Sequence, residues 1–254
     1  MRIFVTSTDV GVGKTWVTCA LARALRAAGR QVVAVKPVET GCSGQPGKGE
    51  DGVRLARATG QTQPAHAILR LAEPVAPVLA SERAGADIDF DALVLKIERF
   101  ADSTEVLLIE GAGGLLTPVT WEWNMTDVAR ALGACALVVG VDRRGTINHT
   151  LLTLSALELA GISCAGVVLT QDVRDSSTGS NSAAIARLSG MERIVARPKV
   201  GDDQAAAASM TQVVGWLSPG WGRLLEACHP ERSEGSTLSV PGFLGDPSSL
   251  RSSG

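Results

Sequence analysis

The chain has 254 residues, of which 45% are hydrophobic, and it carries a net charge of −2 at pH 7. A chain of this length can bury a complete core within one domain. The nearly neutral charge balance, without a stripe of basic residues, argues against a nucleic-acid-binding protein. The longest apolar run, residues 131–141, is far shorter than the roughly 18 residues that a membrane span requires, so we expect no membrane partner.

The cysteines indicate a reducing compartment. Their number is odd and none of them forms a C-x-x-C pair, which favours reduced thiols over a disulfide framework or a zinc site. The N-terminal residues lead directly into an apolar segment, so we expect no signal peptide and a cytoplasmic location. The five cysteines are Cys19, Cys42, Cys135, Cys164 and Cys228.

Short apolar runs alternate along the chain with longer helical patterns. The runs are apolar throughout and do not alternate with polar residues, which is typical of strands buried on both faces of a parallel sheet. The runs that predict strands are residues 2–7, 31–36, 105–110, 135–141 and 164–170.

Helical periodicity covers residues 15–29, 89–101 and 149–161, and the first and third of these end in glycine, a common C-terminal cap. The alternation of strands and helices predicts the α/β class: a single-domain, doubly wound, mainly parallel sheet with helices on both faces. Such sheets bind their ligands at the carboxyl ends of the strands.

The C-terminal part of the chain differs in composition. Residues 204–217 have the pattern of a last helix, whereas residues 228–254 are rich in Ser, Pro and Gly and lack any period. We therefore predict a folded domain over residues 1–227 and a disordered tail over residues 228–254.

The sequence DVGVGKT at residues 9–15 is similar to the phosphate-binding loop G-x-x-x-x-G-K-[ST], without its opening glycine. It follows a predicted strand and opens a predicted helix. Gly11 and Gly13 would let successive backbone N–H groups point at phosphate oxygens. Lys14 would reach the β- and γ-phosphates, and the Thr15 hydroxyl would coordinate Mg²⁺. The alternative is a glycine-rich turn that binds no ligand.

Further motifs extend this match. STDVGVGKT (7–15) resembles the G-T-D-T-x-V-G-K-T loop of dethiobiotin synthetases, and AVKPVETG (34–41) resembles the K-P-V-x-[ST]-G motif of that family. VLLIEGAGGLLTPV (106–119) is similar to the E-G-A-G-G-x-x-x-P segment, and GTINHTLLT (145–153) to G-x-I-N-H-x-L-L-T. The motifs occur in the family's order.

The resemblance implies an ATP-dependent enzyme of biotin biosynthesis with the fold of a P-loop NTPase. Dethiobiotin synthetases make dethiobiotin from 7,8-diaminononanoate, CO₂ and MgATP. A carbamate forms on one amine, ATP phosphorylates it to a carbamic-phosphoric anhydride, and the second amine closes the ring. The resemblance also implies a homodimer.

Two lysines are the predicted catalytic residues, because phosphoryl transfer needs charge neutralisation more than covalent help. Lys36 ends the second predicted strand, at the edge where ligands bind. The resemblance makes Lys36 the residue that holds the carbamate and the migrating phosphoryl group, beside Lys14. A solvated lysine at a strand end is the alternative for Lys36. Thr40 matches a substrate-contacting position, although a plain loop threonine remains the alternative.

Magnesium requires oxygen ligands, commonly one or two carboxylates together with phosphates and water. Glu110 directly follows an apolar strand, and Asp51 matches a metal-binding aspartate of the family, so they are the predicted ligands with Thr15. An ordinary strand-end carboxylate is the alternative for Glu110, and a helix N-cap is the alternative for Asp51. The glycines of residues 111–114 would bring the backbone close to the reacting groups, unless they serve turn geometry alone.

The resemblance assigns the remaining nucleotide contacts. Gln171 stands where the family has the asparagine of an N-D pair that reads adenine, and the RPKV segment (197–200) weakly resembles a C-terminal nucleotide contact. The predicted nucleotide-binding residues are Asp9, Gly11, Val12, Gly13, Lys14, Thr15, Trp16, Asp51, Glu110, Gly111, Ala112, Gly113, Gln171, Asp172, Pro198, Lys199 and Val200.

The segment GTINH is predicted to precede a helix whose free N–H groups bind the substrate carboxylate. A simple N-cap is the alternative for Asn148, and His149 is more easily explained by packing or capping than by catalysis. The predicted substrate-binding residues are Thr40, Gly145, Thr146, Ile147 and Asn148.

Some positions depart from the family's pattern. Ser7 and Val10 replace its glycine and threonine, and Gln171 offers the amide on a longer arm. Arg143 and Arg144 extend one loop and are interpreted as solvated charges. The WEW sequence at 121–123 would either cover the substrate's chain or pack as a loop or dimer contact.

Three other functions are weighed against this one. Partition-type switch ATPases carry a signature lysine at the position of Asp9, so the opposite charge argues against them. A cobyrinate-type amidotransferase would need a glutaminase domain that the chain after residue 200 is too short to supply. A decayed homologue that binds nucleotide without turnover remains an alternative.

Overall fold

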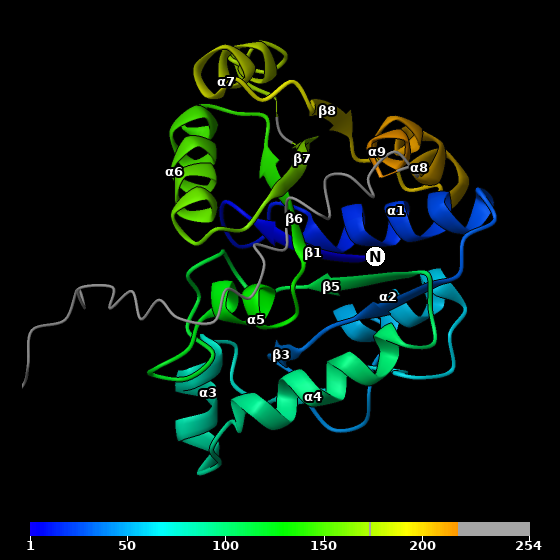
Figure 1. Ribbon diagram of the computed structural model, residues 1–254, viewed down its shortest axis with the longest axis vertical. Helices are drawn as coiled ribbons and strands as arrows, with labels where there is room; N and C mark the ends of the chain where they lie inside the picture. Colours follow the sequence, from blue (N-terminus) through cyan, green and yellow to red (C-terminus); the bar gives the residue numbers. More distant parts are fainter. Residues whose placement is uncertain (173, 218–254) are drawn as a thin grey trace, which may run out of the picture.

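A six-stranded parallel sheet with the order β2-β5-β1-β6-β7-β8 forms the centre of the computed structural model (Figure 1). The structure describes residues 1–172 and 174–217, so the tail predicted for residues 228–254 lies outside the described residues. The strands are β1 (Arg2–Ser7), β2 (Val32–Val35), β5 (Val106–Glu110), β6 (Cys135–Val141), β7 (Cys164–Gln171) and β8 (Ile194–Pro198).

Helices cover both faces of this sheet and bury two separate hydrophobic clusters. One cluster joins the sheet to α1, α2, α8 and α9, and the other joins it to α3, α4, α5, α6 and α7. The predicted doubly wound α/β fold is therefore confirmed. The helices are α1 (Lys14–Ala27), α2 (Asp51–Thr59), α3 (Pro77–Ala84), α4 (Phe90–Ala101), α5 (Met125–Ala131), α6 (Thr146–Leu159), α7 (Asn181–Ser189), α8 (Asp203–Ser209) and α9 (Thr211–Trp216).

All the strands predicted from apolar runs are present, because continuous burial on both faces leaves a strong signal in the sequence. Strand β1 lies between β5 and β6. Helix α1, which follows β1, packs on one face of the sheet, and α5 packs on the opposite face. The chain changes its direction of winding at β1, which places the ligand-binding edge at the carboxyl ends of β1 and its neighbours.

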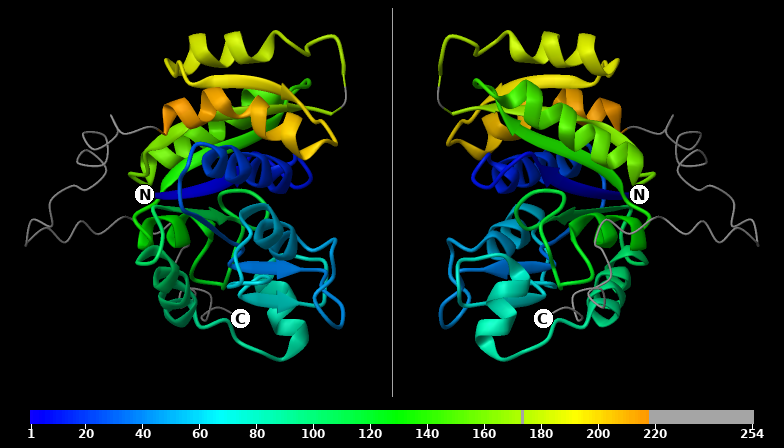
Figure 2. Two further views of the ribbon diagram at one scale, coloured as in Figure 1. Left: turned by 90° about the vertical axis from the view of Figure 1, so that its right-hand side faces the viewer. Right: turned by 90° about the vertical axis from the view of Figure 1, so that its left-hand side faces the viewer.

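A second, two-stranded parallel sheet forms from β3 (Val38–Thr40) and β4 (Leu69–Leu71), and the apolar runs did not predict it. Both strands are too short to show a period. The views in Figure 2 place this small sheet and α3 at the opposite end of the molecule from β8 and α7. Because β3 begins shortly after β2 ends, the small sheet extends the ligand-binding edge of the large one.

Two helix predictions are wrong in their boundaries. Helix α6 begins at Thr146, three residues before the predicted start, because Gly145 has a φ of +89° and serves as its N-cap. Asn148 therefore lies inside the first turn, and the N-cap alternative for it is wrong. The predicted last helix is divided at Met210 into α8 and α9. Among the described helices, none is long and apolar enough to cross a membrane.

Gly52 in α2 allows the helix to lie directly against the backbone that leads into β4. A Cβ atom at this position would lie 2.2 Å from the backbone nitrogen of Ala67. We expect Gly52→Ala to lower the free energy of unfolding by about 1–3 kcal/mol, because two stretches of backbone would have to separate. Denaturant unfolding measures this change.

Gly215 supplies the matched control, because it is also helical and a Cβ there would meet no heavy atom within 4 Å. We expect Gly215→Ala to leave stability unchanged or to raise it by up to about 1 kcal/mol. Equal losses from both substitutions would show that close packing of α2 is not the cause.

Candidate active site

The phosphate loop leaves β1 at Ser7 and enters α1 at Lys14, as the sequence predicted. Gly11 and Gly13 have φ angles of +73° and +98°, which L side chains rarely adopt, and no non-glycine residue of the described chain has a positive φ. At Gly13 the space is also closed, because a Cβ would lie 3.2 Å from both Thr170 and Lys199. Glycine is therefore favoured at Gly13 by its backbone conformation, and the close side chains add to that preference.

The ends of β6 and β7 hold this loop in place. The Thr170 hydroxyl donates a hydrogen bond of 2.7 Å to the carbonyl oxygen of Val12, and the Thr8 N–H donates one of 2.9 Å to the carbonyl oxygen of Val139. The loop is thus preorganised by the sheet, with the first N–H groups of α1 left for an anion.

Ser7, which replaces the family's glycine, has a direct contact with the loop lysine. Its backbone belongs to β1, so the conformational freedom of glycine is not needed there. Lys14 Nζ donates a hydrogen bond of 2.9 Å to Ser7 Oγ, which lies 2.7 Å from the carbonyl oxygen of Asp9. Burial, together with the nearby charge of Lys36, lowers the pKa of Lys14 to about 8. A phosphate group beside Lys14 would favour its charged form.

A buried ionic cluster lies beside this loop. Lys36 Nζ donates hydrogen bonds of 2.8 Å to Glu110 Oε1 and 3.0 Å to Asp51 Oδ2, and Lys36 is only 4% exposed. Burial alone would lower the pKa of Lys36, but Glu110 and Asp51 together raise it above its ordinary value. Burial opposes ionisation of Asp51 as well, yet the charge of Lys36 and the Thr15 hydroxyl lower the pKa of Asp51. Lys36 is thus held as a cation and is not a solvated strand-end lysine.

The predicted magnesium ligands meet at one point. Thr15 Oγ1 lies 2.7 Å from Asp51 Oδ1 and 2.9 Å from Glu110 Oε1. Glu110 is fully buried, and its Oε2 has no hydrogen-bond partner among the described residues. A hydroxyl and two carboxylates, one with an unused buried oxygen, suit a small divalent cation that takes oxygen ligands.

Glu39 determines where α2 begins, a role that no sequence pattern predicted. Its two carboxylate oxygens accept the backbone N–H groups of Asp51 and Gly52. Asp51 is the first residue of α2 and Glu50 is the N-cap, so the N-cap alternative for Asp51 is wrong. Burial raises the pKa of Glu39. The only sequence signal was an acidic residue beside Thr40 in the AVKPVETG motif.

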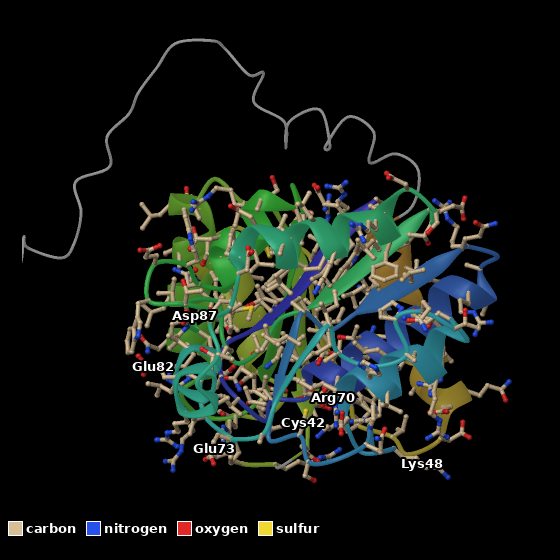
Figure 3. All side chains as sticks on the ribbon, turned by 90° about the horizontal axis from the view of Figure 1, so that it is seen from below. Cys42, Lys48, Arg70, Glu73, Glu82 and Asp87 are labelled. Carbon is tan, nitrogen blue, oxygen red and sulfur yellow. The ribbon has the colours of Figure 1, made fainter. Side chains whose placement is uncertain are left out.

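The carboxylate of Glu50, which lies close to Glu39, forms an ion pair. Arg70 binds Glu50 through two hydrogen bonds of 2.6 and 2.8 Å, and Arg70 and Cys42 lie together in Figure 3. Ligand atoms of Glu39, Cys42 and Glu50 lie within 4.8 Å of one another. Both carboxylates are already bound by N–H donors, so this group is a structural support for α2 and not a second metal centre.

A cavity of about 490 Å³ joins the phosphate loop to the ionic cluster. Thr40 and Lys36 both line it, and Val10, which also lines it, is exposed to solvent. The lining residues are Val10, Gly11, Gly13, Lys14, Thr15, Trp16, Lys36, Val38, Glu39, Thr40, Asp51, Arg54, Ala112, Gly113 and Lys199.

The segment after β8 lies against the phosphate loop. Trp16 Nε1 donates a hydrogen bond of 3.0 Å to the carbonyl oxygen of Val200, and Lys199 Nζ binds Asp172 at 2.8 Å. The structure thus brings the weakly matching RPKV segment to the site. Gln171 is bound differently, because its Nε2 donates to Asp142 Oδ2 at 2.9 Å, and Gln171 does not line the cavity.

The start of α6 lies near the start of the phosphate loop, next to Gly140 of β6. A Cβ on Gly140 would lie 3.3 Å from the Thr146 hydroxyl and 3.4 Å from the Thr8 hydroxyl, so these threonines flank one glycine. The Thr146 hydroxyl is buried and has no hydrogen-bond partner within residues 1–172 and 174–217. Asn148 and His149 are exposed, so the packing interpretation of His149 is wrong.

The WEW segment lies elsewhere. Trp123 stacks on Phe90 with ring centroids 5.0 Å apart, and Trp121 Nε1 donates to Glu82 at 2.7 Å. Together with Asp87 (labelled with Glu82 in Figure 3) they line a separate cavity that shares no residue with the first one. Arg143 and Arg144 are exposed, in agreement with solvated charges.

Comparison with known proteins identifies relatives over most of the chain. A family model described as an AAA domain matches residues 1–203. The ATP-dependent dethiobiotin synthetase of Anaeromyxobacter sp. (strain K) is 41% identical over 217 residues, which cover 84% of this chain and 96% of the relative. The ATP-dependent dethiobiotin synthetase of Aquifex aeolicus (strain VF5) is 35% identical over 193 residues, 76% of this chain and 86% of the relative.

Solved structures share the fold at much lower identity. A MinC:MinD cell division complex of Aquifex aeolicus matches with a TM-score of 0.51 and 16% identity, covering 95% of this chain and 99% of that chain. A ParA family ATPase from Chlorobium tepidum TLS matches with a TM-score of 0.50 and 16% identity, over 90% of this chain and 98% of that one. These likenesses support the P-loop NTPase fold alone.

Removal of the Lys36 charge tests the ionic cluster. We expect Lys36→Met to lower the free energy of unfolding by about 3 kcal/mol without Mg²⁺, because two carboxylates would remain beside each other without their cation. Millimolar Mg²⁺ should restore part of this loss. Thermal or denaturant unfolding with and without Mg²⁺ measures both effects.

The exposed ion pair between Arg83 and Glu73, with an N–O distance of 3.4 Å, supplies the control. Arg83→Met should change stability by less than about 1 kcal/mol and show no special response to Mg²⁺. A Lys36→Met protein as stable as the wild type would contradict the role of the cluster.

Proposed function

The chain belongs to the family of ATP-dependent dethiobiotin synthetases, and we propose that the cavity beside its phosphate loop closes the ring of dethiobiotin from 7,8-diaminononanoate, CO₂ and MgATP. The protein is an ATP-dependent cyclo-ligase of biotin biosynthesis. The observation that carries the assignment of the site is the position of Lys36, a buried cation between Glu110 and Asp51 and on the same cavity as Lys14.

The reaction needs charge control at three successive steps. One amine attacks CO₂, a C–N bond forms, and loss of a proton leaves a carbamate. The carbamate oxygen then attacks the γ-phosphorus of ATP, and ADP leaves. The second amine attacks the carbonyl carbon of the anhydride, and inorganic phosphate leaves with the electron pair of the broken C–O bond. Negative charge develops near the transferred phosphoryl group in each later step.

The two lysines stabilise that charge. Lys36, at the end of β2, binds the carbamate and the migrating phosphoryl group, while Lys14, tethered to Ser7, binds the phosphates of ATP. Thr15, Asp51 and Glu110 would hold Mg²⁺, which would supply neutralisation of the phosphate charge. The buried position of Lys36 keeps water from competing for its charge, which strengthens the interaction.

The remaining contacts surround this centre. Gln171 and Asp172, with residues 198–200, bind the nucleoside part of ATP, and Thr40 donates a hydroxyl to the substrate. The first turn of α6, residues 145–148, binds the substrate carboxylate at an interface between two copies of the chain. The protein acts in the cytoplasm, where thiols such as Cys19 and Cys42 stay reduced.

A coupled assay tests the reaction. Phosphate release from MgATP is measured with and without diaminononanoate and bicarbonate, while mass spectrometry follows dethiobiotin. We expect release that needs both co-substrates and equals the product formed. Steady hydrolysis of ATP at a rate that does not depend on the diamine would support a switch ATPase. Nucleotide binding without formation of any dethiobiotin would support a decayed homologue.

The same assay tests Lys36. We expect Lys36→Met to abolish dethiobiotin formation while MgATP binding, measured by calorimetry at saturating Mg²⁺, remains within a few-fold of the wild type. Arg83→Met again serves as the control and should retain full activity. Loss of nucleotide binding, with normal product formation per bound ATP, would contradict the role given to Lys36.

Homodimer formation is tested at α6. Leu116 and Leu152 are exposed and line one cavity with Thr8 and Gly114, as expected for an apolar surface that a second copy covers. We expect Leu152→Glu to convert the dimer to a monomer in light scattering and to reduce activity. Leu95→Glu, at an exposed leucine of α4, should leave the dimer intact.

A further inference from the structure

Asp142 directly follows β6 and is fully buried. Its carboxylate accepts hydrogen bonds from Asn181 Nδ2 at 2.7 Å, Gly179 N at 2.9 Å and Gln171 Nε2 at 2.9 Å. Within the described chain no Lys, Arg or His forms an ion pair with it. A buried carboxylate without a cation is costly, and only its N–H donors offset that cost.

One of those donors lies at the ligand-binding edge of the sheet. Gln171 ends β7, and the residue before it, Thr170, binds the phosphate loop at Val12. On its other side Gln171 is in register with Pro198 of β8, whose following residue, Lys199, packs against the loop. Asp142 therefore holds Gln171, a residue that lies between Thr170 and the Pro198–Lys199 segment, both of which lead to the phosphate loop.

The chemistry of the amide determines how Gln171 is held. A glutamine amide has a donor nitrogen at one end and an acceptor oxygen at the other, and the two differ little in shape. The three groups that bind the Asp142 carboxylate are all N–H donors, two from side chains and one from the backbone, so the carboxylate accepts a hydrogen bond from each of them. The Gln171 nitrogen must then face Asp142, and its oxygen must face away from it.

We propose that Asp142 is a positioning residue that selects the nucleotide base by fixing the orientation of the Gln171 amide. The inference rests on the proposed function, in which Gln171 contacts the base. With its oxygen directed at the base, Gln171 accepts a hydrogen bond from a 6-amino group. A 6-keto group would bring two acceptors together and leave both without a donor.

The sharpest probe is a pair of nucleotides that differ at this group. ATP has a 6-amino group, whereas ITP has a 6-keto group on the same purine. The ratio of kcat/KM for ATP to that for ITP, measured by dethiobiotin formation, reports base selection and cancels effects common to both nucleotides. We expect the wild type to prefer ATP.

Two substitutions at Asp142 separate orientation from charge. We expect Asp142→Ala to lower the ratio about tenfold, because the Gln171 amide is then free to turn its nitrogen to the base. Asp142→Asn should keep most of the preference. In that variant the backbone N–H of Gly179 still needs an acceptor, so the amide oxygen of the new asparagine takes the place of Asp142 Oδ2. That oxygen then also faces the Gln171 nitrogen. Asp142→Ser replaces Asp142→Ala if the alanine protein does not fold.

Asn181→Ala is the control for a merely structural role, since it removes another partner of the same carboxylate and leaves the contact to Gln171. It should lower thermal stability without changing the ratio. Equal losses with ATP and ITP in Asp142→Ala, with the ratio unchanged, would overturn the proposal.

Gln171→Ala distinguishes failure of this inference from failure of the proposed function. If it lowers the ratio while Asp142→Ala does not, the role of Asp142 alone is wrong. If Gln171→Ala leaves the ratio unchanged, Gln171 does not read the base and the inference falls with that contact. If the wild type forms no dethiobiotin, the reaction is wrong, and competition binding of ATP and ITP to the same variants still tests Asp142.

Discussion

The arrangement of the ligand-binding edge depends on one buried cation. Lys36 enters the protein from the end of β2 and is almost inaccessible to solvent, so it must be compensated where it lies. Glu110 from the neighbouring strand and Asp51 from α2 supply that compensation at 2.8 and 3.0 Å. These elements cannot move independently without leaving an uncompensated buried charge.

That constraint explains the support around it. Asp51 can reach Lys36 only if α2 begins at the right residue, and Glu39 ensures this by accepting the first N–H groups of the helix. Arg70 in turn holds Glu50, the N-cap of the same helix. The small sheet that supplies Glu39 and Arg70 therefore holds α2 in place, and of its two strands only β3 lies within a sequence motif.

The sequence predicted the features that repeat or match a motif, and missed those made by contact across the chain. Continuous apolar runs predicted the buried strands, and the spacing of the glycines predicted the G-K-T core of the phosphate loop. Glu39 was not recognised because a capping carboxylate twelve residues from its helix has no local pattern. Ser7 was recognised only as a departure from the motif's glycine, because only the structure shows its hydroxyl bound to Lys14. The start of α6 was misplaced because a glycine N-cap gives a weaker signal than serine or aspartate.

The phosphate loop lies near the start of the chain, but the groups that pack on it lie in the second half of the sequence. Thr170 binds Val12 across 158 residues, and the carbonyl of Val200 meets Trp16 across 184. The ribosome adds these partners long after the loop, so the growing polypeptide carries an intact motif before the residues that support it have been made. Contacts of such long sequence separation also slow folding, because a large loop must close before they form. We therefore expect the nucleotide site to be complete only after the strands that follow the loop have joined the sheet.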